Sequence, residues 1–280
     1  MTRFASLLSC IVVALSIAQF SLAQQSCCSA NETFVNNSKD PGFNAAHDLR
    51  TSDKKSKLKG SMIKIHTPDS DSANAYLVPA NNPSNKWVFV FHEWWGLNEH
   101  IQNEADELFK ELGDVNVLCL DLYDGLVATN REEASSLMQS AEEYRIRQII
   151  RRAIDLAGYE ADISTIGWCF GGTWAMQAAI MLGRQGKACV IYYGMPELNR
   201  ASLLPLKANV MGIFAEDDKW INKEIVSQFS DLMDVLQKNL DLVVFPADHA
   251  FANPSGSNFN QQFAKEAKKI STAFLIQNFE

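Results

Sequence analysis

Cys169 lies in a short segment that could hold a side chain ready for nucleophilic attack. Residues 166–172 read Ile-Gly-Trp-Cys-Phe-Gly-Gly and join an apolar run to a stretch with helical periodicity. Glycines two residues before and after Cys169 leave room for a sharp turn that raises the thiol above the end of a strand. A helix beginning after Cys169 favours a thiolate and an oxyanion at its N-terminus, with the Phe170 N–H as one donor. A buried structural cysteine in a glycine-rich turn is the alternative interpretation.

A base and an acid follow Cys169 in the order that such a turn requires. Where this turn carries the nucleophile of an α/β-hydrolase, the acid comes next along the chain and the histidine last. Of the five histidines, only His249 follows Cys169. Asp218 comes after an apolar run, with a small residue three places before it and an apolar one three places after it; Asp217 is the alternative. The pattern predicts a nucleophile, a general base and an acid that holds the tautomer of the base.

Alternating apolar runs and helical patterns indicate the elements that position these residues. A buried strand is predicted at 87–91, further strands at 115–120, 163–168, 188–193, 210–214 and 242–245, and helices at 99–112, 131–157, 170–182, 223–236 and 261–279. Apolar strands separated by helices predict a mostly parallel sheet with helices on both faces. Two shorter strands, at 62–66 and 75–78, predict an antiparallel edge on the N-terminal side. The predicted fold class is α/β, in one domain over residues 60–280.

From about residue 60 to its end, the chain resembles the dienelactone hydrolase family of the α/β-hydrolase superfamily. The resemblance rests on segments 92–98 (His-Glu-Trp-Trp-Gly-Leu-Asn), 121–123 (Asp-Leu-Tyr), 167–172 and 249–251 (His-Ala-Phe), together with Asp218. It implies an α/β-hydrolase fold, a Cys169–His249–Asp218 triad, and hydrolysis of a small ester or lactone through a thioester intermediate.

The resemblance also implies roles for Glu93 and Trp94. In the family, a glutamate after the third strand contacts the resting thiol and helps to deprotonate it when substrate arrives. Glu93 follows the predicted strand 87–91, at the edge where such sheets bind ligands, although an ordinary surface acid is the alternative. The Trp94 N–H would be the second oxyanion donor. His92 and Glu93 do not begin a zinc-binding His-Glu-x-x-His motif, because position 96 is glycine; no metal and no cofactor are expected.

The residues expected to bind substrate depart from the family at one position. The family's substrate-binding arginine, four residues after the triad histidine, is replaced by Asn253, and Arg131 is a second candidate for that role. Dienelactone itself is therefore not expected as the natural substrate. Aromatic side chains are predicted to line an apolar pocket, although some could be ordinary core residues: Trp94, Trp95, Tyr123, Phe170, Trp174, Trp220 and Phe251.

The N-terminus has the pattern of a secretory signal peptide. Arg3 precedes an apolar stretch at 7–20, and small residues lead to a cleavage position after Ala23. The sequence thus predicts a signal peptide over 1–23 and a secreted or periplasmic protein, with an uncleaved membrane anchor as the alternative.

Residues 24–59 are polar and show no apolar period. They predict a leader that is loosely ordered or wraps around the surface. Cys27 and Cys28 can pair with each other, with another chain or not at all, and Asn31 and Asn36 begin glycosylation sequons that matter only in a eukaryotic secretory pathway.

Composition narrows the class of function. The chain has 280 residues, 47% of them hydrophobic, and a net charge of -8. This charge argues against a nucleic-acid partner and against stable association with anionic membranes once the signal is cleaved. A small-molecule substrate and a monomer are favoured. Two other functions stay open: an esterase or acyl-transfer enzyme acting on a larger substrate, and a secreted non-catalytic binding protein on the same scaffold.

Overall fold

The structure is a computed structural model that describes residues 30–47, 57–66 and 72–279. The predictions for the signal peptide 1–23, with cleavage after Ala23, and for Cys27 and Cys28 lie outside the described residues. Among the described helices, none is both long and apolar enough to cross a membrane.

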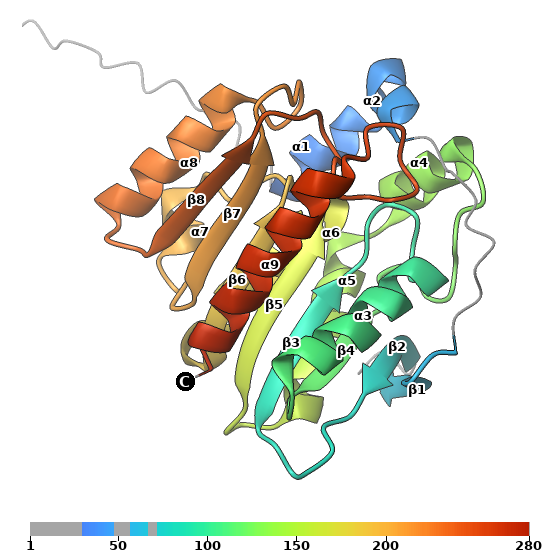
Figure 1. The fold of residues 1–280 in the computed structure, drawn as a ribbon, viewed down its shortest axis with the longest axis vertical. Helices are drawn as coiled ribbons and strands as arrows, with labels where there is room; N and C mark the ends of the chain where they lie inside the picture. Colours follow the sequence, from blue (N-terminus) through green and yellow to red (C-terminus); the bar gives the residue numbers. More distant parts are fainter. Residues whose placement is uncertain (1–29, 48–56, 67–71, 280) are drawn as a thin grey trace, which may run out of the picture.

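The core of the molecule is an eight-stranded sheet with the order β1-β2-β4-β3-β5-β6-β7-β8 (Figure 1). The strands are β1 (Ser61–His66), β2 (Ser72–Val78), β3 (Lys86–Phe91), β4 (Asn116–Leu120), β5 (Asp162–Trp168), β6 (Gly186–Tyr192), β7 (Asn209–Ala215) and β8 (Leu240–Phe245). The pairs β1–β2 and β2–β4 are antiparallel, and all the other pairs are parallel. The predicted fold class, including its antiparallel edge, is confirmed.

Helices cover both faces of this sheet (Figure 1). In that view α3 (Glu99–Leu112) and α9 (Gln261–Gln277) lie in front of the sheet, and α5 (Glu143–Ala157) and α6 (Phe170–Leu182) lie behind it. The other helical elements of residues 72–279 are α4 (Arg131–Ser140), the 3₁₀ turn η1 (Gly183–Gln185), α7 (Arg200–Leu203) and α8 (Lys223–Val235).

The stretch 131–157, predicted as one helical stretch, forms the two helices α4 and α5. The break falls at Ala141 and Glu142, which both have extended backbone angles. Neither residue is a glycine or a proline, so no local signal marks this break.

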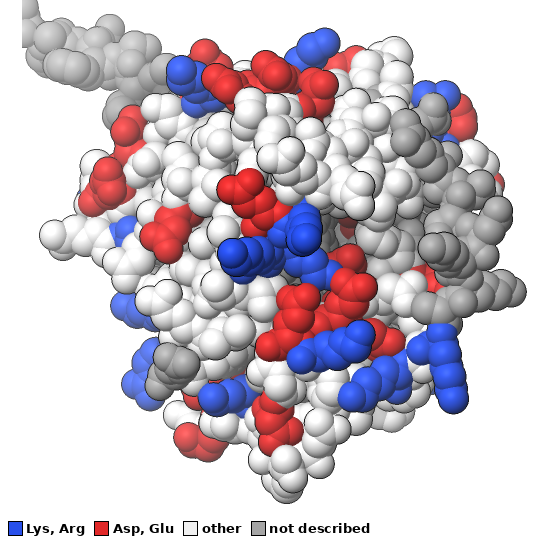
Figure 2. Space-filling view, viewed as in Figure 1, with Lys and Arg blue, Asp and Glu red and all other residues white. Residues whose placement is uncertain are grey.

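The face formed by α3 and α9 carries acidic and basic side chains side by side (Figure 2). Lys268 of α9, for example, pairs with both Glu104 and Glu107 of α3. Interspersed charges of this kind do not form the extended basic surface that nucleic-acid binders use.

Part of the polar leader forms two helices, α1 (Ala30–Asn37) and α2 (Pro41–Ala46). Asp40 caps α2 by accepting a hydrogen bond from the N–H of Gly42, and Pro41 occupies the first turn, where no N–H is needed. Both helices lie against α4, and α1 also lies against α6 (Figure 1). Phe34 and Phe43 are completely buried there. Over residues 30–47, the leader is not loosely ordered but packs against the domain through these two side chains, in agreement with the alternative that it wraps around the surface.

Candidate active site

Cys169 occupies the sharp turn between β5 and α6. Its φ of 57° and ψ of -121° are rare for a residue with a side chain, and such strain persists only where the surroundings impose it. Two hydrogen bonds hold the turn: the Cys169 N–H donates to the carbonyl of Tyr192 at 2.9 Å, and the Gly172 N–H donates to the Cys169 carbonyl at 3.0 Å. The thiol consequently lies at the N-terminus of α6.

The two flanking glycines are required by the close approach of other backbone. A Cβ on Gly167 would lie 2.1 Å from the carbonyl oxygen of Gly171. A Cβ on Gly171 would lie 2.2 Å from the carbonyl oxygen of Phe91, at the end of β3. Both distances are far too short for two atoms that are not bonded to each other. Only glycine, which has no Cβ, therefore lets the turn pack directly on its neighbours.

His249 and Asp218 form a buried pair in the loops after β8 and β7. His249 Nδ1 lies 2.5 Å from Asp218 Oδ2, and neither side chain is exposed. Asp218 Oδ1 accepts the backbone N–H groups of Trp220 and Ile221, each at 2.9 Å. Burial works to raise the pKa of Asp218, but the contact with His249 and these N–H groups outweigh it and hold the pKa below its usual value. The neighbouring Asp217 is exposed.

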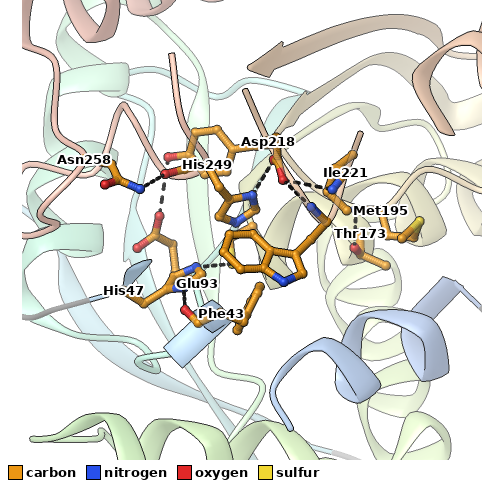
Figure 3. A network of polar contacts seen from close by, with 12 residues as sticks. Phe43, His47, Glu93, Thr173, Met195, Asp218, Ile221, His249 and Asn258 are labelled. Carbon is orange, nitrogen blue, oxygen red and sulfur yellow. Dashed lines mark hydrogen bonds and ion pairs between the residues drawn. The ribbon is translucent and has the colours of Figure 1, made fainter. Parts of the chain in front are cut away.

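The side chain hydrogen-bonded to the thiol is His47, just after α2. Cys169 Sγ lies 3.5 Å from His47 Nε2, and the other ring nitrogen, Nδ1, lies 2.7 Å from the carbonyl oxygen of Phe43. Burial, followed by the nearby His249, lowers the pKa of His47 to about 3, so this imidazole is neutral. Sequence reasoning missed His47 because it precedes the nucleophile, and no local motif marks it. Figure 3 shows His47 in one network with His249 and Asp218.

The thiol itself is held in its protonated form. Burial raises the pKa of Cys169 well above its usual value, and the charge of Glu93 adds to this effect. Backbone hydrogen bonds from Phe170 and Trp94 act in the opposite direction and lower the pKa. Two N–H groups therefore converge on the sulfur, which is the arrangement that an oxyanion next to the sulfur needs.

The model of the dienelactone hydrolase family matches residues 73–279. The chain belongs to this family. Protein usf of Aquifex pyrophilus is 28% identical over 208 residues, which cover 68% of this chain and 89% of that protein. Carboxymethylenebutenolidase 1 of Cupriavidus pinatubonensis is 26% identical over 214 residues, covering 71% and 89% respectively. The dienelactone hydrolase structure from Anabaena variabilis has a TM-score of 0.58 at 17% identity, covers 79% and 99% of the two chains, and supports the fold alone. The protein is thus a carboxylic ester hydrolase.

Glu93 of this dienelactone hydrolase family member is buried beside the nucleophile. The Tyr193 hydroxyl donates to its Oε1 at 3.5 Å, and Asn253 Nδ2 donates to its Oε2. Burial raises the pKa of Glu93 to about 8 against the lowering effect of these two hydrogen bonds. Asn253, which stands at the position of the family's substrate-binding arginine, is therefore engaged with Glu93.

The other residues predicted to bind substrate are spread over the core and its edge. Trp95, Tyr123, Trp174 and Phe251 are buried, and Trp220 is half-buried. Tyr123 and Trp174 both contact the ring of Phe170, with centroid distances of 5.6 and 6.4 Å. The ring of Phe251 instead packs against Tyr193 at 5.6 Å.

The two remaining residues predicted to bind substrate are Arg131 and Asn253. Arg131 is the first residue of α4 and is partly exposed. A cavity of about 470 Å³ between α3 and α9 is lined by Glu93 and Asn253 but not by Cys169.

Residues 30–47 cover the nucleophile. The Phe43 ring packs edge-on against Trp94 and Trp220, with centroid distances of 5.6 and 5.1 Å, and lies 5.7 Å from the ring of His249. Cys169 has no exposed surface. A substrate therefore reaches the thiol only when part of these surroundings moves.

Shortening the Phe43 side chain is expected to open the cover. Phe43→Ala removes a buried ring, a change that typically costs about 3–5 kcal/mol, and a share of that loss weakens the closed state. Alkylation of Cys169 by iodoacetamide, followed by peptide mass spectrometry, should become at least about tenfold faster, because a closed thiol reacts through local opening. Phe263→Ala, at a partly buried ring on α9, is the matched control and should leave this rate unchanged. Equal rates in both variants would mean that Phe43 does not close the site.

Proposed function

We propose that the protein hydrolyses small esters or lactones through a thioester on Cys169, with His249 as general base and Asp218 as the group that orients it. The observation that carries the proposal is the buried His249–Asp218 pair beside a cysteine that receives two backbone N–H groups. Membership of the dienelactone hydrolase family supports the same class of reaction.

The chemistry divides into two acyl transfers. The thiol proton passes to His249, and the sulfur attacks the ester carbonyl, whose π electrons move onto oxygen. The N–H groups of Phe170 and Trp94 stabilise this oxyanion, and the loss of one such donor typically costs about 3–4 kcal/mol. The intermediate collapses, and His249 returns its proton to the leaving alkoxide. Water then loses a proton to His249, attacks the thioester and releases the acid and the thiol.

In this scheme, Glu93 helps to start the first step. A carboxylate with a pKa near 8 is a stronger base than an ordinary glutamate, and its ionised form can accept the thiol proton as substrate enters and then pass it to His249. The thiol is protonated at rest. The reactive thiolate therefore forms only when Glu93 accepts the proton, once the carbonyl group of a substrate is in place.

Removing the Glu93 charge is expected to slow acylation and change its pH profile. In the wild type, the acylation rate should rise with pH as Glu93 loses its proton near pH 8. Glu93→Gln keeps the size of the side chain but has no proton to lose, so acylation should be slower and the rise near pH 8 should be absent. Stopped-flow release of p-nitrophenol measures this step. An unchanged rate and profile would remove Glu93 from the mechanism.

A substrate panel tests the proposed function. It contains five- and six-membered lactones, p-nitrophenyl acetate and butyrate, and, for comparison, long-chain esters and acylated peptides. Turnover confined to the small esters and lactones is expected. Preference for the long-chain or peptide substrates would favour the larger-substrate enzyme, and no turnover together with an unreactive Cys169 would favour the non-catalytic scaffold. A lactone carrying a carboxylate should gain little, because Asn253 replaces the arginine.

A further inference from the structure

Three ligand-type side chains converge in the covered site: His47, Cys169 and His249. One donor atom from each lies within 4.8 Å of the donor atoms of the other two, and all three residues are buried. Cys169 Sγ and His47 Nε2 are 3.5 Å apart, and the two imidazole rings have a centroid distance of 5.0 Å. Ordinary triad chemistry needs only one of these imidazoles, so the second one has no role in the mechanism above.

The hydrogen bonds at Nδ1 place the Nε2 lone pair of both imidazoles toward the thiol, where that of His47 accepts the S–H of Cys169. His47 Nδ1 faces the Phe43 carbonyl oxygen, which only accepts, so this nitrogen carries the proton. His249 Nδ1 is held in the same way by the Asp218 carboxylate. His249 Nε2 is buried and has no hydrogen-bond partner among the described residues. An imidazole whose other nitrogen donates to a carbonyl or a carboxylate is the usual form of a histidine metal ligand.

The distances and the donor types fit zinc. Zinc bonds of about 2.0–2.1 Å to histidine nitrogen and 2.3 Å to cysteine sulfur place neighbouring ligands of a tetrahedron about 3.3–3.6 Å apart. The 3.5 Å between Sγ and His47 Nε2 already has this value, and the remaining separations, at most 4.8 Å, need to close by up to about 1.5 Å. Nitrogen and thiolate donors favour zinc over calcium or magnesium, which prefer oxygen.

We propose that His47, Cys169 and His249 form a zinc site, and that bound zinc inhibits the enzyme. The ion replaces the thiol proton, which is released to solvent, and forms bonds to Sγ and to both Nε2 atoms. It thereby occupies the nucleophile and the base together and fastens the segment that carries His47 over them. A fourth position is left for water. The metal site does not depend on the proposed hydrolytic function; only its inhibitory effect does.

Cobalt titration of the full chain tests the site without any substrate. Co²⁺ bound by a thiolate and two imidazoles gives visible bands and a sulfur-to-metal charge-transfer band in the near ultraviolet. We expect one Co²⁺ per chain with this charge-transfer band, displaced by Zn²⁺, in the wild type and in the control His66→Gln, whose histidine is exposed at the end of β1. Cys169→Ala should abolish the band. His47→Gln should weaken binding by more than the about 10–100-fold loss that a supporting residue outside the ligand set typically causes.

Inhibition is the second readout. Micromolar Zn²⁺ should stop ester hydrolysis by the wild type and by His66→Gln, and a chelator should restore it; His47→Gln should need far more Zn²⁺. Thermal unfolding of each metal-free variant shows whether it is folded. A charge-transfer band that persists in Cys169→Ala, or binding that is equal in folded His47→Gln and the wild type, would overturn the zinc site. If no ester is turned over while the cobalt spectrum is as expected, the proposed function fails and the zinc site stands.

Discussion

Cys169→Ala is expected to lower kcat/KM for p-nitrophenyl acetate by about ten-thousand-fold or more. The variant removes the atom that forms the covalent bond, and the described part of the site offers no other nucleophile at the two N–H groups of Phe170 and Trp94. The loss of one sulfur atom from a buried position leaves the strained turn and both flanking glycines in place. The fold should therefore persist, as circular dichroism and thermal unfolding can show.

Cys189→Ala is the matched control for this experiment. Cys189 is also a buried free cysteine, but it lies within β6 and outside the proposed triad. This variant should keep activity within about threefold of the wild type. The removal of one buried sulfur atom outside the triad affects the stability of the fold rather than the reacting groups. Retained turnover in folded Cys169→Ala would rule out the thioester mechanism.

Asp218→Asn is expected to lower kcat by about ten-thousand-fold, in line with the effect of removing the acid in other triads. The buried carboxylate accepts the Nδ1 proton of His249 and leaves Nε2 free to accept the thiol proton. An amide at the same place can donate to Nδ1, which moves the ring proton to Nε2 and leaves the base unable to act. It also removes the negative charge that stabilises the imidazolium.

Asp217→Asn separates this effect from a general loss of charge in the same loop. Asp217 is adjacent in sequence and exposed, so its substitution should change kcat by no more than a few-fold. Comparable losses in the two variants would show that His249 is not oriented by Asp218. A small loss in folded Asp218→Asn would point to an imidazole that does not need this carboxylate, and His47 is the second imidazole at the thiol.

The parts of the fold that could be predicted are those with local signals. The apolar runs that became β3 to β7 are almost entirely buried, and a strand of that kind leaves a continuous apolar sequence. The turn at Cys169 could be predicted because it requires glycine at positions 167 and 171. A Cβ at either position would lie less than 2.5 Å from a backbone oxygen. The register around Asp218 could likewise be read, since its turn needs residues of particular sizes at fixed offsets.

The covering segment could not be predicted, because its stability depends on contacts distant in sequence. Only Phe34 and Phe43 of α1 and α2 enter the core as large apolar side chains, too few to make a helical period. Phe43 packs on Trp94, Trp220 and His249, which are 51 to 206 residues away along the chain. The position of His47 above Cys169 follows from that packing and from nothing in its own neighbourhood. Similarly, the role of Asn253 as a partner of Glu93 became visible only in three dimensions.

Trapping the acyl-enzyme tests the central claim most directly. The full chain is mixed with p-nitrophenyl butyrate, quenched in acid within milliseconds, digested and analysed by peptide mass spectrometry. The account predicts a butyryl group on the peptide that contains Cys169, formed at the rate of the p-nitrophenol burst, released by hydroxylamine as a thioester is, and absent from Cys169→Ala. Hydrolysis that proceeds with no acyl group on Cys169, or with the acyl group on another residue, would contradict it.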